Sequence, residues 1–256
     1  MHSGAEGWLG HTTPSIGTSE VKLNRLNAFN SPARPYSTAS QREERLPFTV
    51  RVVTTPQDLA KAVEVRASAY ARHLPTLGPA LRSPEAEDLQ PDVLVLLAER
   101  KLDGQPIGSL RLQSNVRRPL RLQGEAPLLQ SFSANRLVES TRLGVGAGPA
   151  SKIVTATLIK AAYEVCRGAE IDYNVIGGRR SMVPVFRSMQ FDELEGGPFP
   201  ISFGNNIPHW IFVLPIREFE ARLERAKHWY YEYFARTAHP DIEIDWAYVL
   251  SAFEYA

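Results

Sequence analysis

The segment from residue 92 to residue 112 constrains the fold of this chain most. Its first part, Asp92-Val93-Leu94-Val95-Leu96-Leu97-Ala98-Glu99-Arg100, is an apolar run of strand length, which predicts a strand buried on both faces. Asp103-Gly104 is typical of a two-residue hairpin turn, and Ile107–Leu112 predicts the returning strand. A buried hairpin of this kind needs covering elements on both faces.

The flanking sequence supplies such elements. Phe48–Val53 alternates and is rich in β-branched residues, which predicts a strand. Thr55-Pro56 predicts a helix start, because Thr caps helices and Pro fits the first turn. Further along the chain we expect a strand at 137–145, a helix at about 150–167, a strand at 171–176, a helix at 180–189, a strand at 210–215 and an amphipathic helix at 217–235. This order predicts an α/β fold with a mixed, twisted central sheet and helices on both faces.

Composition divides the chain into two parts. Residues 1–46 are dominated by Gly, Ser, Thr, Pro and Asn without an apolar period, which predicts a disordered N-terminal tail. Residues 47–256 predict one folded domain that ends in a C-terminal helical extension containing several aromatic side chains. A functional tail and an incorrectly assigned start both fit residues 1–46.

Charge and cysteine content exclude several classes of protein. The net charge of +1 gives no reason to expect nucleic-acid binding. The single cysteine, Cys166, excludes a disulfide framework and fits a reducing compartment, so we expect a cytoplasmic protein. No apolar run reaches the roughly 18 residues of a membrane span. The six histidines lack the spacing of zinc ligands, so no metal is expected.

Several segments resemble a known superfamily. The 92–112 hairpin resembles the central hairpin of the GCN5-related N-acyltransferases, and Pro184-Val185-Phe186-Arg187-Ser188-Met189-Gln190-Phe191-Asp192 resembles their late helix and strand. Phe186 stands where the superfamily has Tyr, and Gln190 stands where it has Gly. Core packing is the favoured interpretation of Phe186, since its ring cannot donate a proton.

Further segments narrow the resemblance. Arg66-Ala67-Ser68-Ala69-Tyr70, the acidic Asp88 and Asp92, Arg111, and Glu139-Ser140-Thr141-Arg142 resemble acyl-homoserine-lactone synthases and, more closely, N-acyl amino acid synthases. The resemblance covers about residues 50–215. It implies an enzyme that moves a long-chain fatty acyl group from acyl carrier protein to the amine of an amino acid, with no resident cofactor. The alternatives are a homoserine-lactone-type signal synthase, an acetyl-CoA-dependent N-acetyltransferase and a non-catalytic acyl-binding module.

The glycine-rich bend Gly144-Val145-Gly146-Ala147-Gly148-Pro149 bears on the acyl donor. It lacks the Arg or Gln that opens the pyrophosphate loop of acetyl-CoA users. The phosphopantetheine arm of acyl carrier protein has no pyrophosphate, so this departure favours the carrier protein over coenzyme A as donor. We expect the bend and nearby basic side chains to hold the arm and its carrier: Gly146, Gly148, Lys152, Arg179 and Arg180.

Aminolysis of a thioester needs a proton acceptor and donors for the oxyanion. Glu139 is the predicted general base, and a backbone N–H at Val145 or Gly146 is the predicted oxyanion donor. In the alternative interpretation Glu139 forms an ion pair with Arg142 or Arg66. No Gly-x-Ser-x-Gly motif is present, and Cys166 lies on a predicted helix, so a serine or cysteine nucleophile is not expected.

Three arginines lie on segments predicted to be buried: Arg66, Arg111 and Arg142. Buried arginines need carboxylate partners or an anionic ligand. An internal ion-pair network with Asp88, Asp92 and Glu139 and a binding site for the carboxylate of the acceptor are both consistent with them. The substrate-binding residues predicted on this basis are Arg66, Tyr70, Asp92, Arg111 and Arg142, although core packing is the stronger interpretation of Tyr70 and of Tyr173.

Two basic groups could dock an acidic carrier protein. One is Arg179, Arg180 and Arg187, and the other is Arg117, Arg118 and Arg121. Solvated charged faces are the alternative interpretation of both groups.

Overall fold

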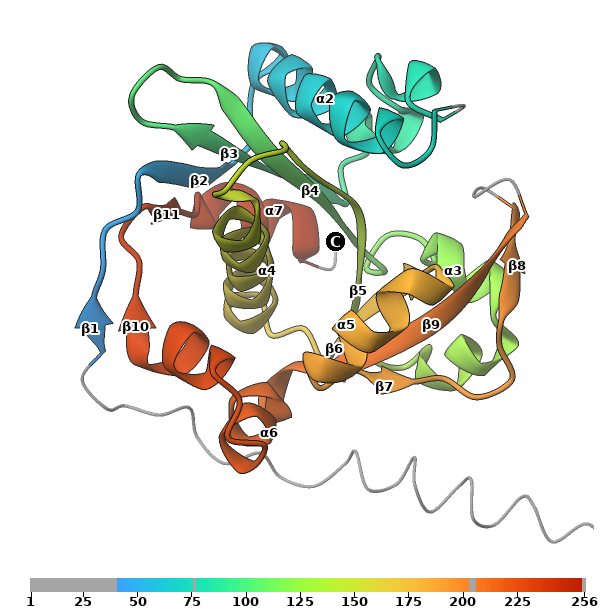
Figure 1. The fold of residues 1–256 in the computed structure, drawn as a ribbon. Helices are drawn as coiled ribbons and strands as arrows, with labels where there is room; N and C mark the ends of the chain where they lie inside the picture. Colours follow the sequence, from blue (N-terminus) through green and yellow to red (C-terminus); the bar gives the residue numbers. More distant parts are fainter. Residues whose placement is uncertain (1–40, 76, 203–205, 255–256) are drawn as a thin grey trace, which may run out of the picture. The chain divides into compact units, whose positions relative to one another are not determined.

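The computed structural model describes residues 41–75, 77–202 and 206–254. The strands are β1 (Arg42–Glu43), β2 (Phe48–Val52), β3 (Val93–Arg100), β4 (Pro106–Ser114), β5 (Leu137–Val145), β6 (Tyr173–Gly178), β7 (Asp192–Glu193), β8 (Phe199–Ile201), β9 (Ile207–Pro215), β10 (Thr237–Ala238) and β11 (Ile242–Glu243) (Figure 1). The α-helices are α2 (Pro56–Ala71), α3 (Arg121–Glu125), α4 (Ser151–Gly168), α5 (Val183–Ser188), α6 (Phe219–Arg225) and α7 (Trp246–Phe253). Short helices are η2 (Pro79–Leu81), η3 (Ala86–Leu89), η4 (Pro127–Phe132), η5 (Arg180–Met182), η7 (Ile216–Glu218) and the π-helical η8 (Glu232–Arg236).

One mixed sheet organises these elements, in the order β11-β2-β3-β4-β5-β6-β9-β7, with β8 paired to β9. β2 to β5 are antiparallel to one another, whereas β5 and β6 are parallel. The buried run that the sequence assigned to the centre of the sheet is β3, and all but its last residue are buried. The predicted α/β class is therefore confirmed.

The two faces of the sheet are covered by different helices (Figure 1). α2 starts as predicted, because the Thr55 side chain accepts a hydrogen bond from the Asp58 N–H and Pro56 occupies the first turn. It packs on β4 and β5 so closely that a Cβ at Gly144 would lie 3.0 Å from the Arg66 Cα. α4 covers the opposite face, where a Cβ at Gly108 would lie 2.8 Å from Val154 Cγ1.

A β-bulge interrupts β5. Ser109 pairs with Gly144 and Arg111 pairs with Thr141, so two residues of β5, Arg142 and Leu143, face Leu110 alone. Arg142 has φ 56°, the left-handed conformation that is costly for a residue with a Cβ. Regular alternation would send Thr141 and Arg142 to opposite faces of the sheet. The bulge instead turns both toward the face covered by α2.

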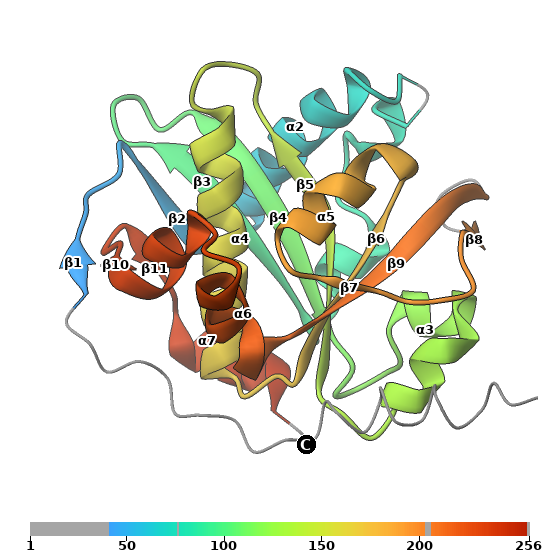
Figure 2. The ribbon, with the colours of Figure 1, turned by 60° about the horizontal axis from the view of Figure 1, so that its bottom comes forward.

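β5 and β6 separate along their length (Figure 2). They pair over three residues, Leu137–Glu139 with Tyr173–Val175. Beyond this point β5 continues to Val145 beside β4, and β6 continues to Gly178 beside β9. The sheet is therefore split beside Glu139, with backbone on both sides of the gap.

The ends of the domain correct one predicted boundary. Residues 41–46 lie in the predicted tail, yet β1 pairs in parallel with β10 and Leu46 is buried. The folded part therefore begins before residue 47, while residues 1–40 lie outside the described residues. The predicted packing of the C-terminal segment is confirmed by α7, which buries Val249, Ala252 and Phe253.

Three local predictions were wrong. The β3–β4 turn is a four-residue loop closed by the Arg100–Gln105 hydrogen bond, not a two-residue turn. Gly177 and Gly178 belong to β6 instead of following it. The helix predicted over 217–235 is broken into η7, α6 and η8. Lys227 ends α6 with φ 48°, and the His228 N–H bonds the Leu223 carbonyl, which is a helix C-cap geometry usually provided by glycine.

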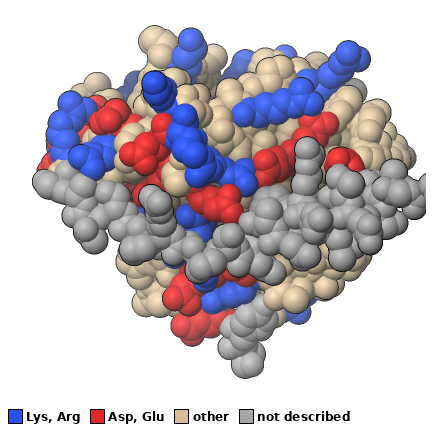
Figure 3. Space-filling view, turned by 90° about the horizontal axis from the view of Figure 1, so that it is seen from below, with Lys and Arg blue, Asp and Glu red and all other residues tan. Residues whose placement is uncertain are grey.

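None of the helices in the described ranges is both long and apolar enough to cross a bilayer. The surface seen from below in Figure 3 carries Lys and Arg side chains interleaved with Asp and Glu. This mixture agrees with the net charge of +1.

Candidate active site

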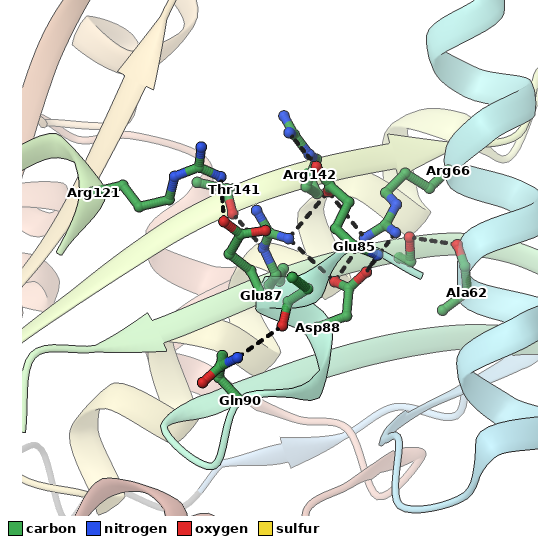
Figure 4. A network of polar contacts seen from close by, with 12 residues as sticks. Ala62, Arg66, Glu85, Glu87, Asp88, Gln90, Arg121, Thr141 and Arg142 are labelled. Carbon is green, nitrogen blue, oxygen red and sulfur yellow. Dashed lines mark hydrogen bonds and ion pairs between the residues drawn. The ribbon is translucent and has the colours of Figure 1, made fainter. Parts of the chain in front are cut away.

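Five charged side chains form a cluster between α2, η3 and the sheet (Figure 4). We call Arg66, Arg111, Arg142, Glu85 and Asp88 the arginine cluster. Both terminal nitrogens of Arg66 donate to Asp88, at 2.9 and 2.7 Å. Arg142 donates to both carboxylate oxygens of Glu85, at 2.6 and 2.7 Å. Such two-point pairs fix the orientation of both partners as well as their separation.

Arg111 joins the two pairs. Its Nη1 lies 3.1 Å from Glu85 Oε2 and 3.3 Å from Asp88 Oδ1, and its Nε donates to the Thr141 hydroxyl at 3.1 Å. The Arg66 Nε is buried and has no hydrogen-bond partner among the described residues. Three guanidinium groups face two carboxylates, so the arginine cluster carries one surplus positive charge.

Burial and charge act in opposite directions on the carboxylates of the arginine cluster. Burial alone pushes the pKa of Glu85 and of Asp88 upward, but hydrogen bonds from the arginines and their charges outweigh it and hold both below the ordinary value. Burial lowers the pKa of Arg111, while the bond to Glu85 raises that of Arg142 against the effect of burial. Both carboxylates are therefore ionised at neutral pH.

Glu139 stands apart from these ion pairs. Its side chain is 1% exposed, and its Oε2 accepts a hydrogen bond from the Leu122 N–H at 3.1 Å. The alternative in which Glu139 pairs with Arg66 or Arg142 is wrong, because those arginines bond to Asp88 and Glu85. Burial raises the pKa of Glu139 above its ordinary value, with the Leu122 bond and nearby arginines opposing the rise. A carboxyl with a raised pKa is suited to proton transfer near neutral pH.

The two candidate oxyanion donors differ. The Gly146 N–H donates to the Ile107 carbonyl at 2.8 Å and is therefore occupied. Because N–H groups alternate along a strand, the Val145 N–H points away from β4, toward the side on which β6 has separated. The geometry therefore favours Val145 over Gly146. The exposed Arg72 also reaches this strand end and donates to the Val145 carbonyl.

Asp92 does not pair with the arginine cluster, contrary to the expected network. Both of its oxygens lie within hydrogen-bond distance of the Arg118 Nε, at 3.1 and 2.9 Å. Its side chain is buried, and its predicted contact with the substrate stays a prediction.

The basic residues predicted to dock a carrier protein differ in whether they have partners within the chain. Arg118 pairs with Asp92, Arg121 with Glu87, and the Arg117 guanidinium donates to the Ser251 carbonyl. Arg187 pairs with Glu193. Three predicted carrier-binding side chains form no ion pair with the described residues: Lys152 at the start of α4, and Arg179 and Arg180 after β6. In the bend before α4, Gly148 has a φ of 142°. Residues with a side chain rarely adopt this backbone conformation.

The remaining predicted residues are mostly packed. Phe186 contacts Phe191 and Phe212, and a Cβ at Gly178 would lie 2.4 Å from its ring, so core packing is confirmed. Tyr173 is buried with its ring edge-on to Phe132. Tyr70 is half-buried next to the charge of Arg142, and burial raises the pKa of its hydroxyl. Cys166 is fully buried, and burial raises the pKa of its thiol.

Sequence reasoning missed Glu85, the carboxylate shared by Arg111 and Arg142. It lies just before η3. The available signal was its spacing from Asp88, because an acidic pair three residues apart can form a reciprocal cap. In the structure the Asp88 carboxylate accepts from the Glu85 N–H at 2.8 Å, which holds both acids toward the sheet.

The surface also has a hollow that lies away from Glu139 and Val145. It runs along the outer side of α2, where it is lined by Ala60, Glu64, Ala67, Ser68, Ala71, Pro75, Gly78, Pro79 and Arg82. These residues do not include Glu139 or Val145. The candidate site is therefore defined by the strand split and its charged residues, and not by this hollow.

The fold of this chain is similar to those of several solved structures. FeeM, an N-acyl amino acid synthase from uncultured soil microbes, superimposes with a TM-score of 0.57 and 12% identity, over 73% of this chain and 97% of FeeM. The chain has the fold of the GCN5-related N-acyltransferases. This confirms the resemblance drawn from the sequence.

Two further structures share this fold. BjaI, a CoA-dependent acyl-homoserine lactone synthase, matches in its complex with MTA at a TM-score of 0.52 and 16% identity, over 80% of this chain and 98% of BjaI. Its complex with SAM and isopentyl-CoA matches at 0.53 and 17% identity, with the same coverage. No protein-family model and no curated protein sequence matches the chain.

Proposed function

We propose that this protein is an N-acyltransferase that moves a fatty acyl group from a thioester to the amine of an amino acid, giving an N-acyl amino acid. The observation that carries the proposal is the split between β5 and β6 beside Glu139 and Val145. FeeM is an N-acyl amino acid synthase and BjaI is an acyl-homoserine lactone synthase, so two enzymes with this fold carry out acyl chemistry.

The split supplies the groups that aminolysis requires. The Val145 N–H is free of β4 and can donate to the oxyanion that forms on the thioester carbonyl. Glu139 can take a proton from the incoming amine through a chain of waters, since its pKa is raised, its carboxyl lies beside the split, and Val145 lies six residues further along β5. The thiolate is a good leaving group, which is consistent with Phe186 where the superfamily has a tyrosine.

The arginine cluster supports an anionic acceptor. Its surplus positive charge would be neutralised by the carboxylate of an amino acid. Arg142 is the most accessible arginine of the cluster. Its side chain is 13% exposed, compared with 2% for Arg66 and 4% for Arg111. We therefore assign Arg142 and the neighbouring Tyr70 to contact with the acceptor, and Arg66 and Arg111 to holding Glu85 and Asp88 in place.

The bend before α4 supports acyl carrier protein as the donor. The Gly146 N–H is taken by Ile107 and the Ser151 N–H by the Gly148 carbonyl, so neither is available to a pyrophosphate. Lys152, Arg179 and Arg180 form no ion pair with the described residues and are suited to attract an acidic carrier. Comparing the rates with acyl-carrier-protein and coenzyme A thioesters tests this choice of donor.

Mass spectrometry of lipid extracts tests this proposal. Cells that express the protein should contain N-acyl amino acids that are absent from cells expressing Glu139→Gln at the same level. A lactone in place of a free carboxylate would assign the chain to the signal synthases. Absence of any acylated amine, when the folded protein is present with acyl carrier protein and amino acids, would refute the proposal.

A further inference from the structure

His209 on β9 has one ring nitrogen fixed and one free. Its Nδ1 lies 2.6 Å from the Ile207 carbonyl oxygen. A carbonyl can only accept, so Nδ1 carries the hydrogen and Nε2 has the lone pair. Nε2 forms no hydrogen bond with the described residues and is not among the buried unpaired atoms. The Nε2 atom can therefore accept a proton, and none of the roles described above uses it.

The topology places this ring on the same face of the sheet as Glu139. Gly177 pairs with Ile211, so His209, two residues away on β9, projects to the same side as a Gly177 side chain would. A Cβ at Gly177 would lie 4.0 Å from His209 Cδ2 and 3.4 Å from Leu122 Cδ2. The Leu122 N–H in turn donates to Glu139.

Gly177 therefore brings the Leu122 side chain and the His209 ring close together on this face, at ordinary contact distance from the position of its missing Cβ. Gly177 lies in the part of β6 that has already left β5. Glu139, Leu122, Gly177 and His209 follow one another across β5, α3, β6 and β9. On this face His209 is therefore linked to Glu139 through Gly177 and Leu122.

The chemistry of the proposed reaction requires two proton transfers. An amino acid carries an ammonium group at neutral pH. One proton must leave before the nitrogen can attack, and a second must leave as the C–N bond forms. One carboxyl can hold one proton at a time, so a second acceptor allows the second transfer to occur before Glu139 has released the first proton.

We propose that His209 is a second proton-transfer residue of this site, an inference that rests on the proposed N-acyltransferase function. Glu139 takes the first proton from the ammonium group and passes it to solvent. The amine nitrogen then attacks the thioester carbonyl carbon, and His209 Nε2 accepts the second proton as the C–N bond forms. When the C–S bond breaks, the imidazolium returns this proton to the leaving thiolate.

The surroundings of His209 keep its ring neutral. Burial lowers the pKa of His209 below its ordinary value, the bond to the Ile207 carbonyl opposes this, and the charge of Arg179 lowers it further. On the neighbouring α3, the Glu125 carboxylate is engaged with Ser202 of the adjoining chain segment. A neutral imidazole at pH 7 is the form that accepts a proton.

The test uses the purified full-length protein with acyl-carrier-protein and coenzyme A thioesters of several chain lengths and a mixture of amino acids. Thiol release and product mass are followed across pH. His209→Asn retains an amide N–H for the Ile207 carbonyl but cannot accept the proton. We expect kcat to fall by about 10²–10⁴-fold with KM unchanged. The acid limb of the kcat profile should lose the contribution of His209, located below about pH 6.5, and retain only that of Glu139. His228→Asn, remote in the chain after α6, is the matched control and should retain wild-type kcat.

A second variant leaves His209 in place. Gly177→Ala adds a methyl group at ordinary contact distance from Leu122 and His209, so the fold should tolerate it. The methyl group separates the ring from the split and should lower kcat by about tenfold or more. Wild-type kcat and an unchanged acid limb in His209→Asn would overturn the role of His209 while leaving the proposed function intact. Absence of acyl transfer by the wild-type protein would overturn both.

Discussion

The two faces of the central sheet share the same strands but differ in chemistry, because the face covered by α2 combines a small apolar cluster with buried charged side chains. On the face covered by α4, side chains such as Leu94, Leu112 and Leu158 form the main apolar core. On the face covered by α2, β4 and β5 present Arg111, Gln113 and Glu139, all buried. The apolar face accounts for stability through burial, whereas the polar face depends on matching each charge with a partner. For this reason we place the proposed chemistry on the face covered by α2.

We expect the largest loss of stability on substitution of Glu85, because this carboxylate forms ion pairs with two arginines. Glu85→Ala should destabilise the protein by about 3–5 kcal/mol, since it leaves the arginine cluster with three guanidinium groups and one carboxylate. Urea denaturation monitored by tryptophan fluorescence measures this change. The exposed pair Arg42–Glu44 is the control, and Glu44→Ala should cost no more than about 1 kcal/mol.

The same carboxylates should make stability depend on pH. Glu85 and Asp88 have pKa values below their ordinary ones in the folded protein. Their contribution is therefore complete above the ordinary carboxyl pKa of about 4 and is lost as pH falls through the folded values. Glu85→Ala should flatten the acid side of the stability profile. An unchanged profile would contradict the assignment of Glu85 to the arginine cluster.

Glu139 should respond in the opposite direction. Its pKa is raised in the folded protein, so its ionisation destabilises the fold as pH rises above the ordinary value of about 4.3. Glu139→Gln retains an acceptor for the Leu122 N–H and should be more stable than wild type at pH 7, by about 1.4 kcal/mol for each unit by which the pKa is raised. Thermal unfolding at pH 4 and pH 7 compares the two proteins. A Glu139→Gln protein that is less stable at pH 7 would indicate a structural ion-pair role instead.

Alanine substitutions at two glycines compare a site packed against backbone with a site packed against side chains. Gly144→Ala brings a methyl group against the backbone of α2 at Arg66 and should cost about 1–3 kcal/mol. Gly177→Ala meets side-chain atoms at 3.4 Å or more and should cost less than about 1 kcal/mol. Chemical denaturation of both variants checks the order. Equal costs would contradict the close packing of α2 on β5.

The smallest expected effect concerns the bulge. Arg142→Gly and Arg142→Ala both remove the pair with Glu85, but glycine adopts φ 56° without strain. Arg142→Gly should therefore be more stable than Arg142→Ala by about 1 kcal/mol. Two variants of equal stability would mean that the left-handed backbone at residue 142 is not maintained.

Local signals predicted the elements that frame the site. The cap at Thr55, the buried run of β3 and the apolar face of α4 each specify an element from a few adjacent residues. The buried charge of Arg66 and Arg111 was also predictable, because arginine on an otherwise buried segment needs a partner. The choice of Glu139 as a candidate general base also came from the sequence, whereas its position beside the separating strand is seen in the structure.

Features that depend on tertiary register could not be predicted in this way. The bulge that turns Arg142 toward Glu85 arises from pairing between β4 and β5. Lys227 and Gln190 adopt positive φ values of 48° and 65°, conformations that the sequence signals only when glycine is present. His209 gave no motif, because its neighbours Gly177 and Leu122 lie far from it in the sequence.

The central claim is that the split beside Glu139 catalyses acyl transfer to an amine. The most direct measurement is turnover of purified protein with acyl carrier protein thioesters and amino acids, followed by thiol release and mass spectrometry, beside Glu139→Gln that is shown to be folded. The account predicts N-acyl amino acids from the wild-type protein and a kcat lower by about 10²–10⁴-fold in the variant. Equal rates from the two proteins, or no acylated product from either, would contradict it.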